Sequence, residues 1–136
     1  MLWDTGPLYA ALDRSDKHHT ASAALMRGTA PPLLVPAPVV VEVCYHLQKR
    51  IGAQAEIAFL RSFQQGHLRQ LAPEDDDFDR AVELVQQYQG FPLGIVDAYV
   101  MAMAERMRIT TIASLDSRHF RAVRLRHCDG LELLPA

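Results

Sequence analysis

The sequence predicts an α/β fold in which a short parallel sheet is packed between helices. Apolar runs of strand length alternate with longer segments of helical period along the chain. Such alternation is typical of a parallel sheet with helices on both faces. The 136 residues, 49% of them hydrophobic, suit a single domain spanning residues 1–136. No apolar run approaches the roughly 18–20 residues of a membrane span, so we expect no contact with a membrane.

The first third of the chain contains two short apolar runs that we expect to form strands. The first is Leu2–Asp4, closed by a turn at residues 5–7. Pro7 favours the first turn of a helix continuing to about Arg14, because that turn needs no N–H from it. A second helix is expected at residues 16–27. The second strand is Leu33–Val35, closed by Pro36.

Residues 39–45 (VVVEVCY) are ambiguous between strand and helix. Their β-branched side chains favour a strand. The length of the run to Arg50, with Pro38 placed to open a helix, favours a helix, which we adopt. A further helix is expected at residues 53–65, with Ile57, Leu60 and Phe63 facing the core.

The second half continues the alternation, with expected strands at residues 68–71, 109–114 and 131–134. A helix at residues 75–89 has apolar side chains at the spacing i, i+3, i+4, i+7, namely Phe78, Ala81, Val82 and Val85. Its acidic start, residues 74–77, is interpreted as a solvated first turn that complements the helix dipole. After Gly94, a nearly apolar helix is expected to run to Met107.

Four carboxylates stand alone in the most apolar stretches: Asp4, Glu42, Asp97 and Asp116. A lone carboxylate in a core segment costs free energy unless it is paired or binds a metal. Two of them, Asp4 and Asp116, lie at the carboxyl ends of expected strands, where α/β sheets bind ligands. Asp97 lies in the first turn of the helix that precedes the Asp116 strand. We therefore expect one shared site.

The chemistry of four converging acids is that of a hard divalent cation. Mg²⁺ prefers oxygen ligands and reverses the repulsion between carboxylates. Such a site activates water and neutralises phosphate, which suits phosphodiester hydrolysis. The histidines His18, His19, His46 and His67 lack zinc spacing, and we assign them surface or structural roles. The net charge of −2 does not itself indicate a nucleic-acid binder.

Four motifs, in this order and spacing, resemble the PIN-domain ribonucleases, and more closely the toxins of VapBC-type toxin–antitoxin pairs. They cover almost the whole chain: residues 2–8 (LWDTGPL), 39–45, 94–99 (GIVDAY) and 112–120 (IASLDSRHF). The resemblance implies a three-layer α/β/α PIN-like fold with a parallel sheet of four to five strands. It also implies an endoribonuclease that is dependent on Mg²⁺, with Mn²⁺ as a substitute.

The resemblance also assigns roles and partners. Asp4 and Asp97 would bind the metal most directly, Glu42 and Asp116 would complete the acidic pocket, and Ser114 would position water or phosphate. Family members commonly form homodimers and are neutralised by a small antitoxin, whose inserted segment often carries an arginine. The implied partners are thus RNA, an antitoxin and a second copy, in the cytoplasm.

Two departures and several alternatives accompany this interpretation. Gly6 replaces the small polar residue common after the Asp-Thr pair, and Trp3 is bulkier than the usual aliphatic neighbour. Glu42 could instead form a buried ion pair with Arg50 or Arg118. A receiver domain would need a late lysine, and a haloacid-dehalogenase phosphatase would need an acid in place of Gly6. The remaining alternative is a catalytically silent PIN-fold binding module.

Overall fold

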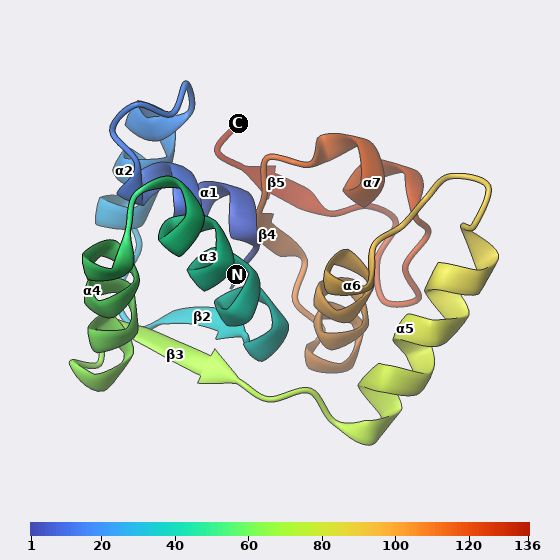
Figure 1. Cartoon of the computed structure of the whole chain (residues 1–136). Coiled ribbons are helices and arrows are strands. Elements are labelled where there is room, and N and C mark those ends of the chain that lie inside the picture. Colours follow the sequence, from blue (N-terminus) through green and yellow to red (C-terminus); the bar gives the residue numbers. More distant parts are fainter.

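The computed structural model describes all residues, Met1–Ala136, as five strands that alternate with seven helices (Figure 1). The strands are β1 (Leu2–Trp3), β2 (Leu33–Pro36), β3 (Leu68–Leu71), β4 (Thr111–Ala113) and β5 (Glu132–Leu134). The helices are α1 (Thr5–Leu12), α2 (His19–Gly28), α3 (Ala37–Arg50), α4 (Ala53–Gln64), α5 (Asp75–Gln87), α6 (Ile95–Met107) and α7 (Ser117–Ala122).

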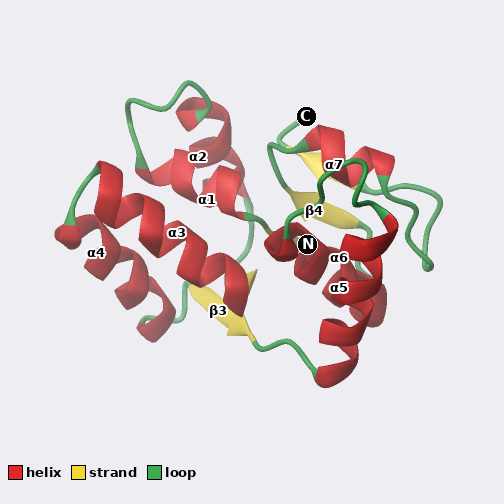
Figure 2. Ribbon diagram, turned by 45° about the vertical axis from the view of Figure 1, so that its right-hand side comes forward, coloured by secondary structure: helices red, strands yellow, loops and turns green.

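The five strands form one parallel sheet in the order β3-β2-β1-β4-β5. The chain steps outward from β1 to β2 and β3, and then returns across β1 to β4. Because parallel crossovers are right-handed, this reversal places α1–α4 and α5–α7 on opposite faces of the sheet. Figures 1 and 2 show the two groups of helices on opposite sides of the molecule. The predicted three-layer fold is confirmed, and the reversal at β1 and β4 is the point where such sheets bind ligands.

The core is built from the sheet and the helix faces that cover it. Trp3 on β1 and Ile112 on β4 are fully buried, as are Leu8 on α1 and Val39 on α3. The middle of helix α6, from Ala98 to Ala104, is buried except for Tyr99, which explains its apolar sequence. No helix of the structure is both long and apolar enough to cross a membrane.

The ambiguous segment at residues 39–45 is helical, as predicted, and lies within α3. The expected turn at residues 5–7 is wrong, because α1 already begins at Thr5. Pro7 remains in the first turn, where no helical hydrogen bond needs its N–H. Helix α7 was not expected, and it is only six residues long.

Two helices expose side chains that the sequence pattern placed inside. On α4, Phe59 is the buried residue, whereas Ile57 and Leu60 are exposed. On α5, Ala81 is buried as predicted, but Phe78 and Val82 are exposed, and the second buried apolar side chain is Leu84. Both helices have apolar residues on more than one side, so periodicity alone does not identify the stripe that meets the core.

The acidic start of α5 is only partly the solvated turn that the sequence predicted. Asp77 is 2% exposed, and both of its carboxylate oxygens accept hydrogen bonds at 3.0 Å from Nε of Arg106 on α6. Glu74 and Asp77 also form a capping box, in which the N–H of Glu74 donates to Asp77 at 2.8 Å. Asp77 is therefore a structural residue that joins α5 to α6.

Candidate active site

A cleft of about 700 Å³ opens at the carboxyl ends of β1 and β4. It is lined by Asp4 and its neighbours 5–6, by Glu42 of α3, by residues 94–97 at the start of α6, and by Leu115 and Asp116 after β4. Four segments that are distant in sequence therefore meet here. The structure brings all four lone carboxylates into this one cleft, as expected from their placement in the sequence.

Asp4 is the most buried of the four acids, with 5% of its surface exposed. The end of β1 holds its backbone, because the Asp4 N–H donates to the carbonyl of Ala113 on β4 at 2.9 Å. Ser114 Oγ donates to Asp4 Oδ2 at 2.9 Å, but Asp4 Oδ1 is buried without a hydrogen-bond partner. A buried carboxylate oxygen normally has a partner, so Asp4 Oδ1 is free to bind a cation or a hydrogen-bond donor.

Burial raises the pKa of Asp4 to about 6, because a charged carboxylate loses its hydration there. The nearby backbone N–H of Thr5 and the hydrogen bond from Ser114 lower that pKa, and repulsion from Glu42 and Asp116 raises it. Since loss of hydration is the largest of these effects, the metal-free carboxyl holds its proton more tightly than an exposed aspartate does.

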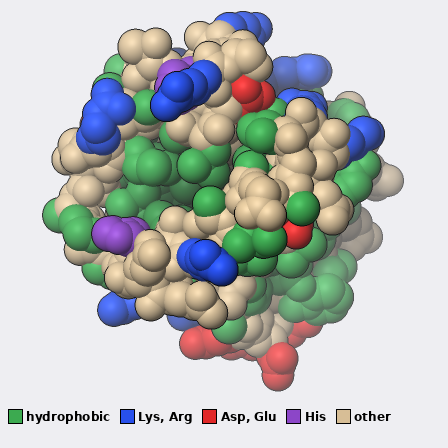
Figure 3. All heavy atoms as spheres, turned by 60° about the vertical axis from the view of Figure 1, so that its left-hand side comes forward, with side chains coloured by type: hydrophobic (Ala, Val, Ile, Leu, Met, Phe, Trp, Pro, Cys, Tyr) green, Lys and Arg blue, Asp and Glu red, His purple; other side chains and the backbone are tan.

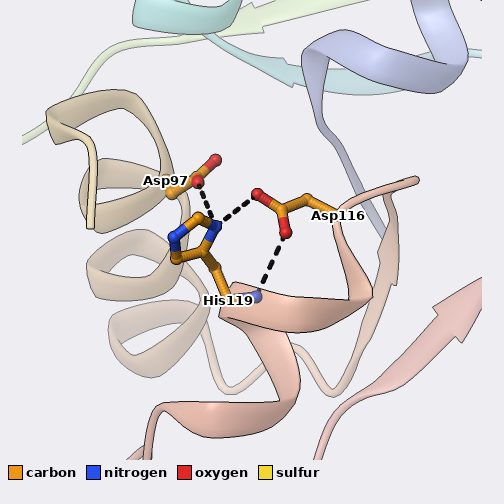
Figure 4. A group of neighbouring side chains, drawn as sticks. All are labelled: Asp97, Asp116 and His119. Carbon is orange, nitrogen blue, oxygen red and sulfur yellow. Dashed lines mark hydrogen bonds and ion pairs between the residues drawn. The ribbon is translucent and has the colours of Figure 1, made fainter. Parts of the chain in front are cut away.

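Asp116 is held at both oxygens by one residue, His119 of α7 (Figure 4). The backbone N–H of His119 donates to Asp116 Oδ1 at 3.1 Å, and the ring Nδ1–H donates to Oδ2 at 2.7 Å. The Asp116 N–H in turn donates to Ser114 Oγ at 3.0 Å. Partial burial opposes ionisation of Asp116, but the bonds from His119 outweigh it, so its pKa is lowered.

Asp97 lies in the first turn of α6 and faces Asp116 and His119 (Figure 4). Its Oδ2 is 3.8 Å from Nδ1 of His119. Burial raises the pKa of Asp97 well above its usual range, and repulsion from Asp4 and Asp116 adds to this effect. The metal-free site therefore keeps a proton at Asp97 while Asp116 stays ionised.

Glu42 projects from the middle of α3 into the cleft and has no hydrogen bond or ion pair with any other side chain. The alternative of a buried ion pair with Arg50 or Arg118 is wrong. Arg50 lies over the ring of Tyr9 at 5.1 Å, and Arg118 lies over the ring of Phe91 at 4.6 Å. The carboxylate of Glu42 is thus available to a ligand in the cleft.

The two departures noted in the sequence have different structural consequences. A Cβ at position 6 would lie 3.2 Å from Cβ of Leu115, the residue next to Asp116, so glycine permits this close approach of α1 to the loop after β4. Trp3 is completely buried on β1, and its Nε1 has no hydrogen-bond partner. The core accommodates the large Trp3 side chain, and Asp4 still lines the cleft.

The donor set of the cleft fits a divalent cation. Carboxylate oxygens of Asp97 and Asp116 lie within 4.8 Å of each other in the cleft, with a ring nitrogen of His119 within the same distance beside them. The unpartnered Oδ1 of Asp4 belongs to the same cleft. In the sequence His119 is part of the motif at residues 112–120, but no role was predicted for it. The signal was its position three residues after Asp116: Asp116 is the N-cap of α7 and His119 the third residue of that helix, a spacing that brings the two together.

Comparisons with known proteins agree with this fold. The family model of the PIN domain matches residues 1–125. Ribonuclease VapC26 of Mycobacterium tuberculosis is 35% identical over 124 residues, which are 91% of this chain and 92% of that protein. The crystal structure of M. tuberculosis VapC20, a sarcin-ricin loop cleaving toxin, superposes with a TM-score of 0.82 at 20% identity, covering 94% and 98% of the two chains. VapBC2 of Rickettsia felis, bound to promoter DNA, gives 0.69 at 15% identity, covering 97% and 95%.

Proposed function

The chain belongs to the PIN-domain family, and from this we propose that it is a Mg²⁺-dependent endoribonuclease, the toxin of a type II toxin–antitoxin pair. The family match, together with the name of the 35% identical relative, supports ribonuclease activity. We propose that residues 1–136 act as one nuclease domain with Asp4, Glu42, Asp97, Asp116 and Ser114 at its active site.

One observation carries the proposal: four carboxylates share a cleft in which a buried oxygen of Asp4 has no partner. Without a cation, this arrangement combines loss of hydration with mutual repulsion. A hard divalent ion removes both penalties. The intact set of acids also speaks against a catalytically silent binding module, for which neutral side chains would cost less free energy.

Asp4, Asp97 and Asp116 are the residues that would hold Mg²⁺, or Mn²⁺ in its place. When bound, such an ion lowers the pKa of a coordinated water and neutralises charge on a phosphate. An oxygen-rich site suits both ions.

The protein itself supplies orientation. Ser114 links two of the acids, since it donates to Asp4 and accepts from the N–H of Asp116. Glu42 has no partner within the protein, so its carboxylate can accept a hydrogen bond from a water in the cleft and orient it toward a phosphodiester. The surrounding protein limits access of bulk water to Asp4, which strengthens these interactions.

The test is cleavage of RNA by purified protein with Mg²⁺, with Mn²⁺ and with EDTA. We expect cleavage with either metal and none with EDTA. Asp4→Asn and Asp97→Asn proteins should remain folded by circular dichroism and lose cleavage, whereas Asp76→Asn, an exposed acid on α5, should cleave as the wild type does. Cleavage that survives both EDTA and the two active-site variants would contradict the assignment.

The antitoxin is proposed as the partner that covers an apolar groove next to α1, α2 and α4. A cavity of about 330 Å³ there is lined by Leu12, Met26, Leu33, Phe59 and Leu68, and Figure 3 shows a hollow among hydrophobic side chains on this side of the molecule. An apolar helix fits such a groove, and an arginine on the partner would complement the acidic cleft. A related fold is seen in a toxin–antitoxin complex from Klebsiella pneumoniae.

The partner proposal is tested by co-expression with the product of a short adjacent reading frame. We expect co-purification, loss of RNA cleavage in the complex, and restored growth of cells that express the toxin. Light scattering of the isolated chain tests the proposed homodimer. Because the proposed substrate is cellular RNA, we also propose that the protein acts in the cytoplasm.

A further inference from the structure

We propose that His119 is a positioning residue, which orients the Asp116 carboxylate and thereby sets the metal affinity and the turnover of the site. This inference rests on the ribonuclease function proposed above. It assigns a role to a side chain that no step of that proposal uses.

His119 contacts both oxygens of the Asp116 carboxylate. The backbone N–H and the ring Nδ1–H of the histidine each donate to a different oxygen of the same carboxylate, at 3.1 and 2.7 Å. Two donors in fixed positions leave the carboxylate a single orientation. The oxygen atoms keep lone pairs for a further interaction, because each carboxylate oxygen can accept more than one bond.

A residue of the loop that precedes α6 also holds the ring of His119 in place. Phe91 packs against the imidazole with ring centroids 4.9 Å apart and an interplanar angle of 54°. The guanidinium of Arg118 lies over the same Phe91 ring at 4.6 Å. These contacts form a continuous chain from the exposed surface to the cleft: Arg118 packs on Phe91, Phe91 on His119, and His119 binds Asp116.

Positioning explains these contacts better than direct metal ligation does. Asp97 and Asp116 line the cleft, whereas His119 is not among its lining residues. Figure 4 shows the imidazole beside the two acids, with its Nδ1 directed at Asp116. An Nδ1 that donates a proton to a carboxylate has no lone pair for a metal, so only Nε2 of His119 could be a ligand atom, and the spectrum of Mn²⁺-loaded protein tests that atom. Second-layer histidine and carboxylate contacts of this kind orient metal ligands in other proteins.

The experiment compares three substitutions of the same residue. In His119→Asn the amide nitrogen takes the place of Nδ1, so the bond to Asp116 can form again. His119→Gln instead places its amide nitrogen near the position of Nε2, and His119→Ala removes the donor. Every variant keeps the backbone N–H, and thermal unfolding in EDTA confirms that each is folded. His18→Ala, an exposed histidine without a side-chain hydrogen bond in the structure, is the matched control.

The first readout is metal binding without RNA, measured by titrating Mg²⁺ or Mn²⁺ and following the unfolding temperature or calorimetric heat. We expect about 10- to 100-fold weaker binding in His119→Ala and His119→Gln. His119→Asn should recover most of the loss, and His18→Ala should match the wild type. At saturating metal, kcat for RNA should follow the same order with KM little changed, since His119 acts through Asp116.

Two results would overturn the inference while leaving the ribonuclease function intact. One is wild-type metal affinity and kcat in folded His119→Ala. The other is a nitrogen hyperfine coupling from a coordinated imidazole in the electron spin-echo spectrum of Mn²⁺-loaded wild type, lost in His119→Ala, which would make His119 a ligand. Failure of the wild type itself to bind metal and cleave RNA would instead refute the function on which the inference rests.

Discussion

Ser114 Oγ donates a hydrogen bond to Asp4 Oδ2 at 2.9 Å, although the two residues lie 110 positions apart. The bond joins the ends of β1 and β4, which are neighbours in the sheet. Ser114 also accepts the N–H of Asp116. One hydroxyl therefore sets the relative position of two acids.

Ser114→Ala should lower both stability and Mg²⁺ affinity. The change removes the donor to Asp4 and the acceptor for the Asp116 N–H, and bonds to charged groups contribute about 1.5–3 kcal/mol. Urea unfolding and a Mg²⁺ titration measure the two effects. Ser62→Ala, which removes only an exposed bond to the Ala58 carbonyl, is the control and should change neither quantity appreciably. If Ser114→Ala and Ser62→Ala had the same stability and the same Mg²⁺ affinity, Ser114 would have no role in the site.

Asp4→Asn should stabilise the metal-free protein while it destroys metal binding. At neutral pH the raised pKa of about 6, compared with 3.8, corresponds to an unfavourable charge burial of about 3 kcal/mol. The amide removes that charge, so the unfolding free energy in EDTA should rise by up to this amount. Adding Mg²⁺ should stabilise the wild type and leave Asp4→Asn unchanged. If Asp4→Asn were less stable than the wild type in EDTA, burial of the Asp4 charge would not cost the free energy given above.

The metal-free protein should lose stability as the pH rises from about 4 through about 6. In that window the unfolded Asp4 has lost its proton while the folded carboxyl still holds it, so the unfolded state binds fewer protons. The raised pKa of Asp97 extends the loss to higher pH. Asp116, whose pKa is lowered, acts in the other direction, and its contribution disappears only as the pH falls below about 4.

Metal binding should show the complementary pH dependence, because a cation needs the ionised carboxylates. The increase in unfolding temperature caused by Mg²⁺ should therefore grow between pH 5 and pH 8. Scanning calorimetry with Mg²⁺ and with EDTA measures both curves. In the double variant Asp4→Asn, Asp97→Asn the unfolding temperature should depend much less on pH in both conditions. A stabilisation by Mg²⁺ that does not change with pH in the wild type would argue against protonated acids in the metal-free site.

Asp77→Ala should unfold far more easily than Asp76→Ala, although the two acids are adjacent. Asp77 is buried, closes the capping box of α5 and binds the partly exposed Arg106, so its loss should cost about 1.5–3 kcal/mol. Asp76 is exposed, so its loss should stay within about 0.5 kcal/mol. Chemical denaturation gives both values. Cleavage of RNA per folded molecule should be unchanged in either variant, since this acidic run lies outside the cleft.

Leu12→Asp should abolish co-purification with the antitoxin and preserve RNA cleavage. Leu12 lines the apolar groove and is 39% exposed, so a charge there opposes docking of an apolar helix without entering the core. Val82→Asp, on α5 at 45% exposure, is the matched control and should still bind. A pull-down from cells that co-express the antitoxin measures binding. Equal binding by both variants would show that the antitoxin does not dock in this groove.

Much of the fold followed from local patterns. The strand at residues 68–71 and the end of α6 at Met107 agree with the structure, since apolar runs, Gly and Pro mark such boundaries locally. The phase of α4 was wrong for a physical reason. Ile57, Phe59, Leu60 and Phe63 form two overlapping apolar stripes, and contact with the rest of the core selects the one containing Phe59.

The sequence by itself determined that Asp4, Glu42, Asp97 and Asp116 belong together, because lone charges in apolar segments are too costly to remain separate. Only the tertiary structure decided how they are held: Ser114 at Asp4, His119 at Asp116, and Glu42 left unpaired. It also decided that Asp77, in the acidic run, is a buried partner of Arg106. Hydrogen bonds of this kind depend on distances between distant segments, and only the folded sheet brings those segments together.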